Sequence, residues 1–109
     1  MKEKFYIVAE RINPQLGTYL SDVYVGTKRV NKQTISCVYE RFGEKQTMRF
    51  EKYVEPENHS HCDIGGDNCV YGSMAYYGFD TPEDAAAYLT KRWPKHYNFE
   101  RCMKKLQAA

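Results

Sequence analysis

Lysine and arginine are missing from residues 53–84, although the chain of 109 residues contains 16 of them in all. This segment has a formal charge of −7, whereas the whole chain has +2. Residues 1–52 carry +4 and residues 85–109 carry +5, so charge is separated along the sequence. Separated charge usually marks a surface that another molecule recognises. The acidic residues of the segment are Glu55, Glu57, Asp63, Asp67, Asp80, Glu83 and Asp84.

Long hydrophobic runs are also missing from the chain. The apolar run near the start ends at Glu10 and Arg11, so we expect neither a signal peptide nor a membrane-spanning helix. A cytoplasmic protein is therefore predicted, with its four cysteines reduced and no disulfide framework. A length of 109 residues fits one domain, residues 1–109, with a single core.

Catalytic motifs are a third absence. The sequence contains no glycine-rich phosphate loop, no paired metal-binding carboxylate motif and no nucleophile elbow. An enzyme needs a nucleophile or an acid–base pair on rigid support, and no such pattern is visible. We therefore expect a protein that acts by binding rather than by catalysis.

The first half of the chain has the alternating pattern of β-strands. Apolar and polar residues alternate on both sides of Gly43, which predicts a hairpin with a glycine in its turn. Asn13 and Pro14 mark another turn, and residues 26–28 interrupt the second strand. The predicted strands cover residues 4–12, 19–25, 34–42, 46–54 and 73–79.

Helical signals appear in the last third of the chain. Thr81 is a predicted N-cap, Pro82 suits the first helical position, and Pro94 ends the helix, which covers residues 81–93. A second helix is predicted over residues 98–107. The fold class is therefore α+β, with a four- or five-stranded, mainly antiparallel sheet packed on two C-terminal helices.

Residues 55–72 are predicted to form a long acidic loop with histidine and cysteine in it. Imidazole and thiolate are zinc ligands, so a zinc-stabilised domain is one interpretation of this loop. The spacing argues against it, because the two cysteines are seven residues apart without a second pair of closely spaced ligands. We expect no cofactor unless zinc binds here; the candidate ligands are His59, His61, Cys62 and Cys69.

The acidic segment predicts a docking surface for a protein with a basic groove. Charge would steer the encounter and tyrosine would supply buried area. We therefore expect an inhibitor or adaptor, with a nucleic-acid-processing enzyme as a possible partner. The aromatic strand predicted at residues 73–79 would also allow a homodimer. The predicted partner-binding residues are Glu55, Glu57, Asp63, Asp67, Tyr76 and Tyr77.

In size and composition the chain is similar to the small single-domain inhibitors carried by phages and mobile elements, anti-CRISPR proteins among them. The similarity is one of size and composition alone, and it implies inhibition of a host nuclease without assigning a role to any residue. The alternative interpretation is RNA or DNA binding by the basic C-terminal helices, in which lysine and arginine alternate with aromatic residues. The residues of this second surface are Lys91, Arg92, Lys95, Arg101, Lys104 and Lys105.

Overall fold

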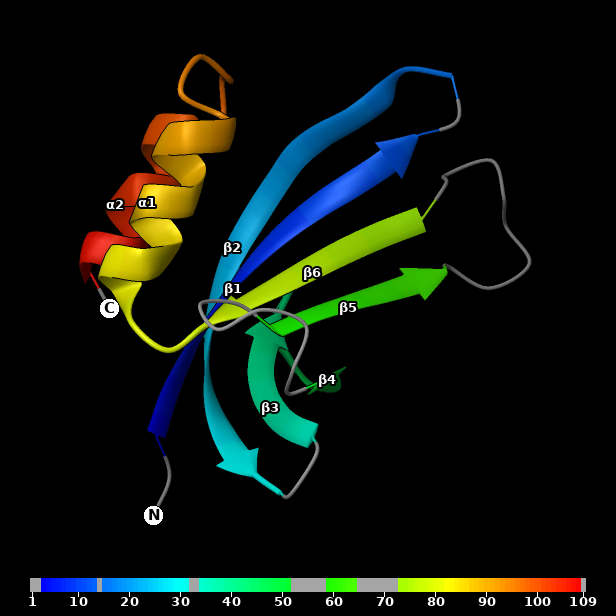
Figure 1. Ribbon diagram of the computed structural model, residues 1–109, viewed down its shortest axis with the longest axis vertical. Coiled ribbons are helices and arrows are strands. Elements are labelled where there is room, and N and C mark those ends of the chain that lie inside the picture. Colours follow the sequence, from blue (N-terminus) through cyan, green and yellow to red (C-terminus); the bar gives the residue numbers. More distant parts are fainter. Residues whose placement is uncertain (1–2, 14, 32–33, 52–58, 65–72, 109) are drawn as a thin grey trace.

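Six strands precede two helices in the computed structural model, which describes residues 3–13, 15–31, 34–51, 59–64 and 73–108. The strands form one antiparallel sheet in the order β4-β3-β2-β1-β6-β5 (Figure 1). The predicted α+β class, antiparallel sheet and two C-terminal helices are confirmed. The elements are β1 (Glu3–Asn13), β2 (Gly17–Val30), β3 (Thr34–Arg41), β4 (Glu44–Glu51), β5 (His59–Ile64), β6 (Ser73–Phe79), α1 (Pro82–Arg92) and α2 (Phe99–Ala108).

One strand was not predicted from the sequence, and another is longer than predicted. Residues 59–64, predicted to lie in the acidic loop, form β5, which pairs with β6 at the edge of the sheet. Strand β2 continues through the interruption predicted at residues 26–28 and ends at Val30. Gly26 is buried there, and a Cβ atom on it would lie 2.4 Å from the carbonyl oxygen of Val38. The glycine therefore lets β3 approach β2 instead of ending the strand.

The sheet is so strongly curved that it folds over onto itself. In a flat sheet, β1 and β4 would be about 14 Å apart, because three strand spacings separate them. The ring centroids of Phe5 on β1 and Phe50 on β4 are nevertheless only 5.3 Å apart, in an edge-to-face arrangement. The edge strands β4 and β5 also come into contact. One face of the sheet is therefore concave and the other convex.

The concave face encloses one hydrophobic core. Its side chains come from β1, β2, β3, β4 and β6, and Phe5, Ile7 and Cys37 are fully buried. Two tyrosines of the sheet, Tyr24 and Tyr39, also lie on this face, with ring centroids 5.1 Å apart. The face that the helices leave free is thus filled by the sheet itself.

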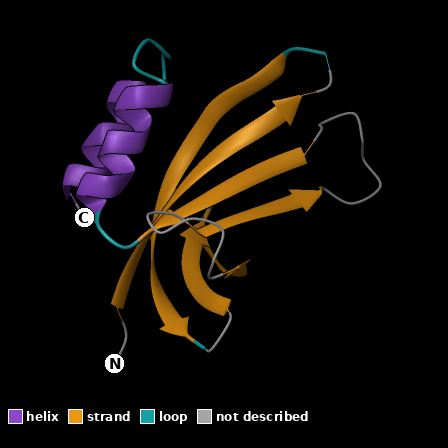
Figure 2. Ribbon diagram, in the orientation of Figure 1, coloured by secondary structure: helices purple, strands orange, loops and turns teal. Residues whose placement is uncertain are grey.

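The convex face packs against both helices and forms a second core. Val8, Leu20 and Val23 from the sheet meet Leu89 of α1 and Leu106 of α2. Figure 2 shows the two helices together on one side of the sheet. They cover β1, β2 and β6, while β3 and β4 make few contacts with them. The two helices therefore leave the convex face of β3 and β4 uncovered.

The helix boundaries follow from local chemistry. The hydroxyl of Thr81 accepts a hydrogen bond of 3.1 Å from the backbone N–H of Asp84, which makes Thr81 the N-cap of α1, as predicted. The first helical hydrogen bond of α2 joins the N–H of Cys102 to the carbonyl of Asn98, so Asn98 is its N-cap residue. Neither described helix is long and apolar enough to cross a membrane.

Candidate functional site

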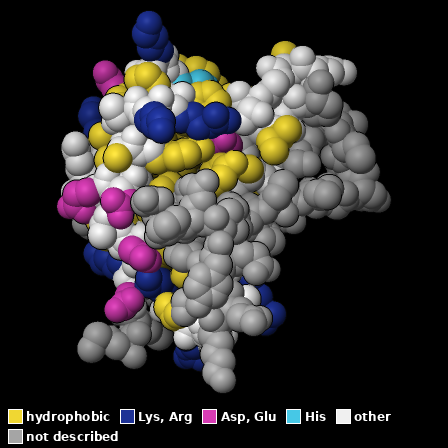
Figure 3. All heavy atoms as spheres, viewed as in Figure 1, with side chains coloured by type: hydrophobic (Ala, Val, Ile, Leu, Met, Phe, Trp, Pro, Cys, Tyr) yellow, Lys and Arg dark blue, Asp and Glu magenta, His cyan; other side chains and the backbone are white. Residues whose placement is uncertain are grey.

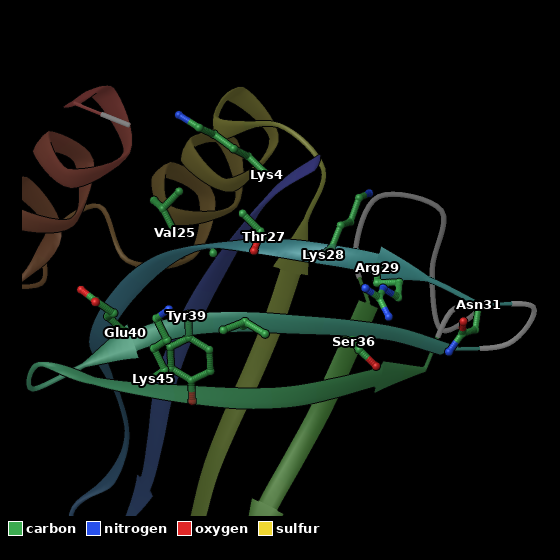
Figure 4. Close-up of a pocket in the computed structure, with 12 residues that line it drawn as sticks. Lys4, Val25, Thr27, Lys28, Arg29, Asn31, Ser36, Tyr39, Glu40 and Lys45 are labelled. Carbon is green, nitrogen blue, oxygen red and sulfur yellow. The ribbon is translucent and has the colours of Figure 1, made fainter. Parts of the chain in front are cut away.

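A hollow opens on the convex face where β2 and β3 separate. The two strands pair only from Thr27 to Val30 on β2 and from Ile35 to Val38 on β3. Beyond Val38, β3 remains paired with β4 alone and leaves β2. The resulting hollow has a volume of about 770 Å³ and is lined from β1, β2, β3 and β4 (Figure 4).

The hollow is basic. Lys4, Arg29 and Lys45 line it from three different strands, and all three side chains are exposed. Among the described residues that line the hollow, Glu40 is the one that carries a carboxylate, and Lys45 lies opposite it in the strand register. Arg49, also exposed, is paired with Ser36 at the margin of the hollow. We call Lys4, Arg29, Lys45 and Arg49 the basic sheet face.

Lys28 also lines the hollow, but its charge is used within the fold. The side chain is only 8% exposed, and its ammonium group forms an ion pair with Asp80 and lies 3.7 Å from Glu3. The ammonium group also lies 5.2 Å from the centroid of the Phe5 ring. Lys28 therefore fixes the wall of the hollow, and the cations available to a ligand are those of the basic sheet face.

A buried carboxylate fixes the end of α1 to the sheet. Glu10 is fully buried and accepts hydrogen bonds from the indole N–H of Trp93 at 2.8 Å, from Nε of Arg92 at 3.2 Å and from the Tyr88 hydroxyl. Burial raises the pKa of the Tyr88 phenol above its usual range, and the bond to Glu10 raises it further. The phenol is therefore the donor in this pair, and the cluster joins α1 to β1.

Aromatic rings are stacked where α1 is connected to α2. His96 stacks on Tyr97 with ring centroids 4.4 Å apart, and it lies nearly parallel to Tyr19 of β2 at 6.4 Å. Trp93 meets His96 edge to face at 5.5 Å. Tyr97 is 81% exposed, so its ring is accessible to solvent. We call Tyr19, His96 and Tyr97 the aromatic stack.

Half of the cations predicted on the helices are engaged within the molecule. Arg92 binds Glu10, the ammonium of Lys105 lies 2.8 Å from Asp22, and Arg101 donates to the carbonyl of Ser21 at 2.8 Å. Lys91, Lys95 and Lys104 are exposed. Figure 3 shows basic side chains over the end of α1 and acidic ones over its start. The helices therefore offer less free positive charge than their sequence indicates.

The predicted acidic docking surface lies mostly outside the described residues. This applies to Glu55, Glu57 and Asp67, whereas Asp63 lies on β5 in register with Met74. Of the two tyrosines, Tyr76 is 3% exposed in the concave core, and Tyr77 is half-buried against Tyr88 with ring centroids 5.4 Å apart. Tyr76 is therefore covered within the fold, Tyr77 keeps part of its surface exposed, and docking through the acidic residues stays a prediction.

Three of the four candidate zinc ligands lie on one strand, and the fourth lies outside the described residues. His59, His61 and Cys62 lie on β5, in register with Gly78, Tyr76 and Ala75, and Cys69 lies outside the described residues. Within the part of the chain that is described, no three His, Cys, Asp or Glu side chains are grouped as a metal site would require. Zinc binding by this segment stays a prediction.

The basic sheet face was missed at the sequence level because its residues are far apart in the chain. Lys4 and Arg49 are brought together only by the register of four strands. The charge of +4 over residues 1–52 was the available signal.

Comparison of the chain with protein-family models, curated proteins and solved structures gave no match.

Proposed function

We propose that this protein binds nucleic acid, with the basic sheet face holding the phosphate backbone. The observation that carries the proposal is the hollow on the uncovered convex face, where three exposed cations from β1, β2 and β4 surround a single described carboxylate. Phosphate contacts from lysine and arginine supply most of the affinity of proteins for nucleic acid, independently of sequence.

The support is the placement of charge on rigid elements. Strands hold Lys4, Arg29 and Lys45 in a fixed register, and Lys28 within the wall is already neutralised by Asp80 and Glu3. A polyanion entering the hollow would meet cations without having to displace those ion pairs. An acidic segment elsewhere in the chain would then favour one orientation of the approaching strand.

The test is fluorescence anisotropy with a labelled single strand of 15 nucleotides, made as DNA and as RNA, at low salt. The sheet variant replaces Lys4, Arg29 and Lys45 by Gln. The helix variant replaces Lys91, Lys95 and Lys104 by Gln, so it removes the same formal charge from the surface predicted on the helices. Substitution of exposed side chains such as these changes stability little, which circular dichroism will verify.

We expect the sheet variant to bind at least tenfold more weakly than the unmodified protein, and the helix variant to lose less. Equal losses in both variants would mean that net charge, rather than the hollow, controls binding. Absence of a complex with either strand at low salt would refute nucleic-acid binding altogether, and docking of the acidic segment on a basic protein would then be the remaining interpretation.

A further inference from the structure

The aromatic stack is built to present one ring to solvent. Asn98 donates its backbone N–H to Nδ1 of His96 at 3.1 Å, so this imidazole nitrogen acts as an acceptor. The side-chain amide of Asn98 in turn donates to the carbonyl of Leu20 at 3.0 Å, which joins the connection between the helices to β2. His96 is therefore held in place beneath Tyr97.

The middle ring of the stack, His96, is also contacted at its edge by Trp93, which is fixed at the end of α1. The backbone N–H of Trp93 donates to the carbonyl of Leu89 at 2.7 Å, and its indole N–H donates to the buried Glu10. The guanidinium of Arg92 lies 4.9 Å from the centroid of the Trp93 ring. Trp93 is thus held at the edge of the His96 ring. Lys95, which precedes His96 in the sequence, adds an exposed cation.

We propose that the exposed ring of Tyr97 stacks on an unpaired base of a single-stranded nucleic acid. The inference rests on the proposed function and names its ligand more closely. Proteins bind single strands by stacking the bases on aromatic rings that are flanked by cations, because every base offers a flat π-face. A ring already stacked on His96 loses little freedom when a base adds to the same stack.

One nucleic-acid strand can reach both the basic sheet face and the aromatic stack. The aromatic stack includes the connection between α1 and α2, which lies at one end of the molecule, and β1 begins near the opposite end, close to the N-terminus (Figure 1). The longest dimension is 41 Å. At the rise of about 3.4 Å per nucleotide that a strand has in B-DNA, about 12 nucleotides cover that length.

The experiment compares oligothymidylate of 15 nucleotides with an abasic strand of the same length, so that the phosphates are matched and only the bases differ. Stacking of a single base contributes roughly 1–3 kcal/mol, which corresponds to about a fivefold to 150-fold preference for oligothymidylate. The Tyr97→Ala variant should lose this preference and Tyr97→Phe should keep it. Phe42→Ala is the matched control, because Phe42 is 91% exposed but lies in the turn between β3 and β4.

The outcomes separate the two proposals. If the unmodified protein binds neither strand, nucleic-acid binding itself fails, and the stacking inference fails with it. If it binds both strands equally, or if Tyr97→Ala keeps the preference for oligothymidylate, nucleic-acid binding stands and the assignment of Tyr97 is wrong. Loss of the preference in Tyr97→Ala alone, with Phe42→Ala unchanged, supports the inference.

Discussion

Glu10 is the residue on which the joint between sheet and helices depends most. Its carboxylate is fully buried, and the residues that bind it follow 78 to 83 positions later in the chain. Burying a charge costs several kcal/mol unless hydrogen bonds and an opposite charge compensate it. Trp93, Tyr88 and Arg92 supply this compensation, so removal of the carboxylate leaves three donors without their acceptor, two of them partly buried.

Replacement of Glu10 by Ala should lower the free energy of unfolding by about 1–3 kcal/mol, the range for leaving hydrogen-bond donors without an acceptor. Glu10→Gln should cost less, because an amide oxygen still accepts from the indole of Trp93. Urea denaturation followed by circular dichroism measures both values. The control is Glu100→Ala on the exposed side of α2, for which we expect a change within about 0.5 kcal/mol. Equal effects of Glu10→Ala and Glu100→Ala would contradict this role for Glu10.

Buried thiol and phenol groups make the protein sensitive to alkali. Burial raises the pKa of Cys37 to about 12 and the pKa of Tyr39 to about 12. The same groups ionise near pH 9 and 10 in the unfolded chain. Unfolding therefore releases protons above pH 9, so stability should stay constant below that pH and fall steadily between pH 9 and 12 as far as these groups are concerned.

Urea denaturation at a series of pH values measures this loss. Cys37→Ala should reduce the slope above pH 9, since one of the groups with a raised pKa has been removed, even though the variant is less stable at neutral pH. A midpoint that is the same at pH 8 and pH 11.5 would show that these side chains ionise equally well in the folded state.

Strand β6 contains a glycine that has no space for a side chain. It lies between β1 and β5, and a Cβ atom placed on Gly78 would come within 2.2 Å of the Phe5 ring. Gly78→Ala should therefore lower the free energy of unfolding by about 3 kcal/mol through overpacking. Phe5→Leu in the same chain should recover part of that loss, and a double-mutant cycle measures the recovery.

Gly43 is the comparison for Gly78. It has a φ of +78° in the turn between β3 and β4, but an added Cβ atom would have nothing within 4 Å. Gly43→Ala should thus cost only the backbone strain, about 1–2 kcal/mol, and Phe5→Leu should not rescue it. Rescue of both variants by Phe5→Leu would mean that the contact with the ring is not what makes Gly78 necessary.

The elements were largely predictable because their signals are local. Thr81, Pro82 and the glycine of the β3–β4 turn act within a few residues, and the structure confirms the strand or helix beside each. The length of β2 was not predictable, because Gly26 indicates a break in the strand as long as the close approach of Val38 on β3 is unknown. Strand β5 was missed for the same reason, since its pairing with β6 outweighs a loop-like sequence.

The basic sheet face and the closed concave core are properties of the whole molecule. Two helices on one side of a sheet would leave the other face of a flat sheet open to solvent. Curvature instead turns that face inward, where Tyr39 is 5% exposed. Curvature depends on contacts between distant strands, such as Phe5 with Phe50, which no local pattern contains.

Nucleic-acid binding by the basic sheet face predicts a definite dependence on salt. Each phosphate contact to a single strand contributes about −0.7 to the slope of log K against log salt concentration. The four cations Lys4, Arg29, Lys45 and Arg49 should give a slope of about −3, and the sheet variant, which keeps only Arg49, a slope of about −1. Anisotropy titrations between 50 and 200 mM salt measure it. Identical slopes for the two proteins would place the phosphate contacts elsewhere.

The central position of β1 determines when the fold can be completed during synthesis. Strand β1 lies between β2 and β6, and the residues that bind Glu10 belong to α1. At about 5–20 residues per second, a ribosome needs roughly 5–19 s to add the residues between the end of β1 and the end of α2. For that interval, Val8, Leu20 and Val23 have no helices to cover them, so the nascent chain exposes an apolar surface that chaperones recognise.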